Sequence, residues 1–183
     1  MDRQGVYFES KKYRMITVEL ILKIQEQFRI NWYGRHGISH WARVYDIGMK
    51  LAEETGGDRG VVQLFALFHD SCRYNEHFDP RHGPRGAELA AQLRSHYFPG
   101  LTGEKFDLLY QACCLHTTAA THNNITVQTC FDADRLDLGR VRKKPKAKFL
   151  CTDAAKSKEM IAWAYQRSVK GAVPENILGT MVV

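Results

Sequence analysis

The residues best suited to chemistry lie where a long apolar segment ends. The segment from Val61 to Phe68 has Gln63 as its one polar residue and leads directly into His69 and Asp70. Burial of an ionised carboxylate is costly unless a partner compensates its charge. An arginine, a helix end or a metal cation near Asp70 would provide that compensation.

Other histidines and aspartates that could join a metal site recur along the chain. They are His36, His40, His82, His116, Asp132, Asp134 and Asp137. No cysteine stands in a ligand-like spacing, so we expect a mixed nitrogen and oxygen site. Imidazole suits Zn, Fe, Ni or Co, whereas carboxylate and water suit Mg or Mn. The sequence therefore predicts one or two divalent ions, drawn from Mn, Fe, Co, Ni, Zn and Mg.

The elements that must position these residues are predicted to be helices. Apolar residues recur at helical spacing behind a Thr17 N-cap and again over 38–55, where Gly56 and Gly57 end the pattern. Five later segments are also predicted to be helices. One runs from an Asp58 cap to about Cys72, and the next covers 84–98 with Pro84 in its first turn. The other three begin after the candidate caps Thr102, Thr126 and Thr152, and the last of them covers 153–168. Alternating Val, Ile and Thr strands are missing. We therefore predict an all-α protein, a single domain over residues 1–183 folded as an orthogonal bundle.

Composition excludes several classes of protein. Of the 183 residues, 44% are hydrophobic and 25% charged, which is ordinary for a globular domain. No apolar run approaches the roughly 18 residues of a membrane span, and the first residues lack a signal-peptide core, so we expect a cytoplasmic protein without membrane contact. The five cysteines show no CxxC spacing and are expected to be reduced thiols. Gly37 replaces the glutamate of an HExxH helix, which disfavours a metalloprotease.

The net charge of +6 favours anionic partners such as nucleotides, phosphate esters or nucleic acid. Part of this charge lies in "RVRKKPKAK", residues 140–148. A solvated loop is the favoured interpretation of this run, and a nucleic-acid contact is the alternative.

Three segments together resemble the HD-domain superfamily of metal-dependent phosphohydrolases: "HGISHWARV", "LFALFHDSCR" and "DADRLDLGR". The similarity covers about residues 35–141 and implies an HD-type helical bundle. It also implies four metal ligands, which are His40, His69, Asp70 and Asp134. The second histidine of an HxxxH pair takes the first ligand position, so His36 is not expected to bind. Asp132 and Asp137 are then supporting or structural residues, although Asp137, one turn beyond Asp134, could face the site.

Binuclear members of the superfamily place two additional histidines between the HD pair and the last aspartate. His82 and His116 stand in this order, although the step from His69 to His82 is short. A second metal is one role for them. The alternatives are a substrate-facing or capping role for His82 and a helix-end role for His116.

The resemblance and the charge together predict hydrolysis of a small nucleotide-like phosphate ester, either a monoester or a diester, by a metal-activated water. Asp70 would bind metal and accept a proton, with Glu76 or Asp79 as other acceptors. His82 or Arg73 would stabilise charge on the phosphoryl oxygens. The predicted phosphate-binding residues are Arg73, Arg81 and Arg85. Two alternatives are an HD-type di-iron oxygenase and a non-catalytic binder of nucleotides or nucleic acid. The sequence predicts no oligomeric state.

Overall fold

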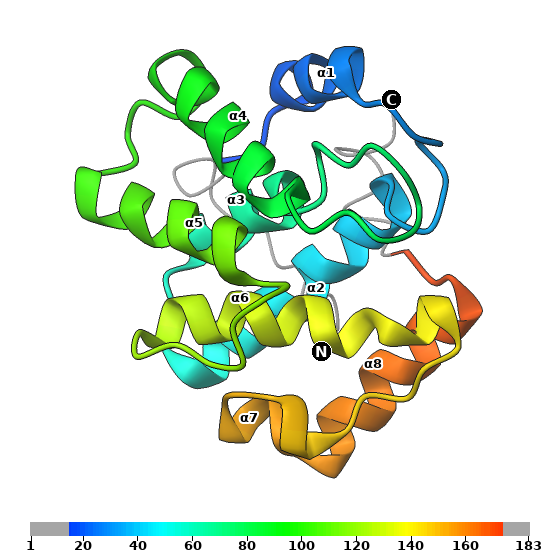
Figure 1. Ribbon diagram of the computed structural model, residues 1–183. Helices are drawn as coiled ribbons and strands as arrows, with labels where there is room; N and C mark the ends of the chain where they lie inside the picture. Colours follow the sequence, from blue (N-terminus) through cyan, green and yellow to red (C-terminus); the bar gives the residue numbers. More distant parts are fainter. Residues whose placement is uncertain (1–14, 174–183) are drawn as a thin grey trace, which may run out of the picture.

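The computed structural model describes residues 15–173, which form helices and connecting turns and contain no β-strand (Figure 1). The α-helices are α1 (Val18–Gln27), α2 (Ile38–Thr55), α3 (Arg59–Phe68), α4 (His82–Tyr97), α5 (Gly103–Leu115), α6 (Ile125–Leu136), α7 (Asp153–Lys156) and α8 (Lys158–Lys170). Two 3₁₀ helices, η2 (Asp137–Val141) and η3 (Ala147–Phe149), follow α6. The predicted all-α class is confirmed.

Several helices begin and end where the sequence predicts. The side chains of Thr17, Asp58 and Thr102 each accept a hydrogen bond from the backbone N–H three residues ahead. Helix α2 has the predicted bounds and ends at Gly56, whose φ of 75° lies in the left-handed region.

Four boundaries differ from prediction. Helix α3 ends at Phe68 rather than near Cys72, because Ser71 donates both its N–H and its hydroxyl to the Phe68 carbonyl and so replaces the next helical bond. Asn124, not Thr126, caps α6, since the Thr126 hydroxyl accepts from the distant Asp58 N–H. The predicted last helix is divided at Ser157, which has an extended ψ and caps α8. His82, expected just before its helix, is instead the first residue of α4.

Helix α3 occupies the centre of the core. Every residue from Val61 to Phe68 is buried, and the helix packs against α2, α4, α5 and α6. Helix α1 lies at one edge of the bundle, and α7 and α8 lie at the opposite edge (Figure 1). Because these four helices surround α3, residues from several of them can meet the residues at its C-terminal end. Within residues 15–173, no helix has the length and apolar character that a bilayer crossing would need.

Candidate metal centre

Three predicted ligands from distant parts of the chain meet at the end of α3. His40 Nε2, from the first turn of α2, lies 3.0 Å from Nε2 of His69. Asp134, on α6, places Oδ1 3.4 Å from His40 Nε2 and 3.9 Å from His69 Nε2. Both histidines are fully buried. We name His40, His69 and Asp134 the first triad, a group whose ligand atoms lie close enough together to hold one metal ion.

A second triad, formed by Asp70, His82 and His116, lies beside the first. His82 is the first residue of α4 and His116 is the C-cap of α5. Their Nε2 atoms are 3.0 Å apart, and His82 Nε2 is 3.1 Å from Oδ1 of Asp70. The short sequence step from His69 to His82 therefore does not prevent His82 from reaching the site, because the loop between α3 and α4 returns to Asp70.

Asp70 faces both triads with different oxygens. Its Oδ2 lies 3.5 Å from His40 Nε2 and 3.7 Å from His69 Nε2, whereas its Oδ1 faces His82. The buried carboxylate thus has one oxygen directed to each group. This arrangement can bridge two cations.

Close packing of α4 against α5 brings the second triad together. A Cβ atom on Gly83 would overlap the carbonyl oxygen of Cys113 and lie 3.1 Å from Cε1 of His116. Glycine is therefore needed for His82 and His116 to approach each other, since backbone cannot yield as a flexible side chain can.

The histidine donors are oriented for cation binding. Nδ1 of His69, His82 and His116 contacts the carbonyl oxygens of Phe65, Asp79 and Cys113, respectively. A carbonyl only accepts, so each Nδ1 carries a proton, and an Nε2 without a proton directs its lone pair into the site. Two such lone pairs 3.0 Å apart, in His82 and His116, repel each other unless a proton or a cation lies between them. The donor set therefore fits a metal.

His40 is held differently, by the carboxylate of Asp137. The distance from His40 Nδ1 to Asp137 Oδ2 is 2.7 Å, and Arg43 Nε donates to Asp137 Oδ1 at 2.7 Å. A carboxylate behind a histidine fixes the ring and increases its basicity as a ligand. Asp137, whose role the sequence left open, thus supports the first triad.

The electrostatics keep the aspartates of both triads ionised. Burial raises the pKa values of Asp70 and Asp134, but the neighbouring imidazoles outweigh burial and hold both pKa values well below their usual range. Burial lowers the pKa of His69 to about 3, so this ring is neutral. Burial and Arg140 lower the pKa of His40, yet the surrounding carboxylates raise it to about 9. A proton at His40 Nε2 and a bound cation are alternatives, because both neutralise the same carboxylates.

The three predicted phosphate-binding arginines occupy different environments. Arg73 is buried beside the site, with NH1 3.2 Å from Asp70 Oδ1, and it also donates to the carbonyls of Asn75 and His77. Arg81 is exposed at the start of α4.

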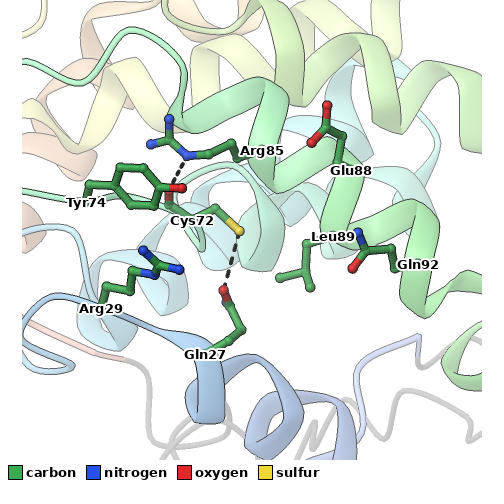
Figure 2. A pocket seen from close by; sticks show the side chains of 8 residues that line it. All are labelled: Gln27, Arg29, Cys72, Tyr74, Arg85, Glu88, Leu89 and Gln92. Atoms are coloured by element: carbon green, nitrogen blue, oxygen red, sulfur yellow. Dashed lines mark hydrogen bonds between the residues drawn. The ribbon is translucent and has the colours of Figure 1, made fainter.

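Arg85 lies in a separate pocket of about 200 Å³ between α1 and α4, and Figure 2 shows it stacked over the ring of Tyr74. Its Nε donates to the Cys72 carbonyl, and its NH2 donates to Asp79 at 2.6 Å. No residue of either triad lines this pocket among those the structure describes. The structure therefore brings Arg73, but not Arg85, to the ligand residues.

Three other acidic or histidine candidates have their own partners. His36 contacts Glu76 through Nδ1 and belongs to neither triad. Asp132 accepts from Thr152 and from the Cys151 N–H, so it joins α6 to the start of α7. Asp79, a predicted proton acceptor, binds Arg85 instead.

Arg140 is the residue near the site that the sequence interpretation missed. It was assigned to the basic run, but its NH2 lies 3.4 Å from Asp134 Oδ1 and its NH1 donates to the Asp137 carbonyl. Its buried Nε has no hydrogen-bond partner among residues 15–173. The signal was the three-residue spacing from Asp134 to Asp137 to Arg140, because i and i+3 share a face in a 3₁₀ helix.

Comparisons with known proteins agree with this geometry. A sequence model described as "HD domain" matches residues 37–139. The chain is similar in structure to a predicted HD superfamily hydrolase from an uncultured Thermotogales bacterium, with a TM-score of 0.62 and 25% sequence identity. The similarity covers 88% of this chain and 90% of that chain. No curated protein matches this sequence significantly.

Proposed function

Because the chain belongs to the HD domain family, we propose that it is a metal-dependent phosphohydrolase acting on a small nucleotide-like phosphate ester. The observation that carries this proposal is the pair of adjacent triads joined by Asp70. Two metal sites sharing a carboxylate are suited to displacement at phosphorus, where one site can hold the attacking oxygen and the other a phosphoryl oxygen. The similar structure named as a hydrolase supports the same class.

The chain would hold the metals with six residues. His40, His69 and Asp134 would bind one ion with Oδ2 of Asp70, and His82 and His116 would bind the other with Oδ1. Four imidazoles favour Mn, Fe, Co, Ni or Zn over Mg, which prefers oxygen ligands. When bound, such a cation lowers the pKa of a coordinated water and polarises the phosphoryl group.

Other side chains would manage charge and protons around the reacting group. Arg73 contacts Asp70 directly and fixes the orientation of its carboxylate. The Arg140 guanidinium adds positive charge beside Asp134 and would attract the phosphate of a substrate. The carboxylate of Asp70 or Asp134 would accept a proton from an attacking water.

The test is hydrolysis of a panel of mononucleotides, cyclic nucleotides and simple phosphate esters, each assayed with Mn, Co, Ni, Mg and Zn. Hydrolysis is measured as phosphate release for the monoesters and as appearance of the mononucleotide for the cyclic nucleotides. We expect turnover that requires metal and is abolished in His69→Ala and His116→Ala variants that remain helical. Elemental analysis should show about two ions per chain in the wild type and fewer in both variants. Metal-loaded protein that hydrolyses none of these substrates would contradict the proposal.

One other function is favoured by a specific observation. A carboxylate directed at two histidine-rich triads also suits a pair of irons, so oxygen-dependent oxidation by a di-iron centre is the second candidate. Product formation that requires iron and O₂, without phosphate release, would select it. The oxygenase assay should therefore be run on an iron-loaded sample prepared in parallel, with and without O₂.

A further inference from the structure

A cavity of about 530 Å³ lies away from both triads, beside the segment that follows α6. Its lining consists of Arg135, Leu138, Lys143, Lys144, Pro145, Lys146, Phe149 and Leu150. Pockets for small molecules usually measure about 300–1,000 Å³. None of these residues belongs to either triad, so the cavity is separate from the proposed metal centre.

The wall of this cavity combines apolar and cationic surface. Leu138, Pro145 and Leu150 form an aliphatic lining, and the Phe149 ring beside them is 61% exposed. Lys143, Lys144 and Lys146 contribute three ammonium groups. Among the described lining residues none carries a negative charge, and no ion-pair partner of the three lysines is found within residues 15–173. The cavity therefore presents positive charge that a bound anion could neutralise.

Hydrogen bonds to backbone carbonyls fix the wall of the cavity. Arg135 donates to the carbonyls of Ala119, Ala120 and Phe149 at 2.6, 2.8 and 3.1 Å, so its guanidinium secures the wall. The turn after η2 is closed by the Lys143 N–H, which donates to the Leu138 carbonyl at 3.1 Å. A preformed wall reduces the ordering cost of ligand binding.

We propose that this cavity, the lysine pocket, is a second ligand site that binds a small molecule with a planar ring and a phosphate group, such as a mononucleotide. Phe149 is 61% exposed, and Lys148 Nζ lies 4.9 Å from the centroid of its ring on one face. A planar ligand would stack on the other face, and aromatic stacking is tolerant of base identity. The three lysines offer the positive charge for the phosphate. The limited volume and the aliphatic lining favour one small ligand over an extended nucleic-acid strand, which tracks along a long groove.

The lysine pocket is placed to influence the metal centre. Asp134 and Arg135 are consecutive on α6, and Asp137 and Leu138 are consecutive in η2. These two turns therefore carry Asp134 and Asp137, which belong to the first triad or support it, next to Arg135 and Leu138, which line the lysine pocket. A ligand there would contact none of the triad residues, so any effect on the metal centre would have to pass through these two turns.

The test is equilibrium binding of AMP and ATP by titration calorimetry, using full-length protein with the His69→Ala substitution so that turnover and the first triad are removed. We expect saturable binding that the Lys143→Gln/Lys144→Gln/Lys146→Gln triple variant weakens at least about tenfold. Phe149→Ala should weaken it about 5- to 160-fold, the range expected for loss of one stacked base.

The matched control removes the same charge from another surface. Lys50, Lys158 and Lys170 lie on α2 and α8 and do not line the cavity. Their replacement by Gln should leave the affinity unchanged, and inorganic tripolyphosphate should bind without dependence on Phe149. Equal losses in the two triple variants would overturn the proposal, as would binding of single-stranded oligonucleotides with no binding of mononucleotides. These outcomes are independent of whether the metal centre hydrolyses phosphate esters.

Discussion

The most decisive perturbation of the first triad is Asp137→Asn, because it removes charge behind a ligand without removing the ligand. Asp137 is fully buried and its two oxygens hold His40 and Arg43. Asparagine has nearly the same shape, but it cannot bind both groups as a carboxylate does. We expect His40 to become less basic and less firmly oriented.

The magnitude follows from the role of such supporting residues. Loss of the partner behind a metal-bound histidine typically costs about 10- to 100-fold in metal affinity. This range corresponds to about 1.4–2.8 kcal/mol of binding free energy. The lower end applies if the asparagine carbonyl still accepts from His40 Nδ1, and the upper end applies if the carbonyl turns to Arg43 and leaves the NH2 group facing His40 Nδ1.

Asp132→Asn is the matched control for this experiment. Asp132 is equally buried, lies on the preceding turn of the chain, and accepts three hydrogen bonds from Cys151 and Thr152. Its loss should lower the free energy of unfolding, since hydrogen bonds to a charged group contribute about 1.5–3 kcal/mol each. It contacts neither triad, so metal affinity should remain that of the wild type.

The assay is competition for the metal against a chelating indicator, with circular dichroism to confirm that each variant is folded. Wild-type metal affinity in Asp137→Asn would refute the reasoning. Equal losses of affinity in the Asp137 and Asp132 variants would also refute it, because the effect would then follow from general destabilisation.

Three further predictions concern the surroundings of the triads. His36→Ala should retain nearly wild-type metal content by elemental analysis, whereas His40→Ala should lose most of it; equal losses would reverse the choice of ligand. Gly83→Ala should lower the melting temperature and the occupancy of one of two ions, because the added Cβ would meet the backbone of α5. Gly100→Ala, which has open space around its Cβ, should change neither. Unchanged metal stoichiometry in folded Gly83→Ala would contradict this prediction. Arg140→Gln should raise KM at least about tenfold for an active phosphate ester, with little loss of metal, and an unchanged KM would exclude Arg140 from substrate binding.

Local sequence signals predicted most of the helix boundaries. Thr17, Asp58 and Thr102 act as caps because the interaction involves only the next three residues. The resemblance to the HD-domain superfamily is confirmed by the family match over residues 37–139. The pattern of histidines and aspartates also anticipated which side chains the structure gathers at the end of α3.

Features that depend on distant partners could not be predicted in this way. Thr126 was expected to cap α6, but its hydroxyl is engaged by Asp58, far away in sequence. Arg85 follows the HD pair closely, yet Tyr74 and Asp79 draw it into another pocket. Arg140 belongs to a basic run in the sequence, and only the 3₁₀ turn after α6 brings it to Asp134.

The same distinction between local and distant contacts separates the four histidines of the site. His69, His82 and His116 are each oriented by a carbonyl three or four residues earlier, so formation of their own helix end or turn is enough to aim Nε2. His40 depends instead on a carboxylate 97 positions away. Its orientation is complete only when α2 and η2 have packed together. A perturbation that shifts η2 should therefore weaken the first triad before it weakens the second, and this is why Asp137 is the supporting residue whose loss reveals most about the centre.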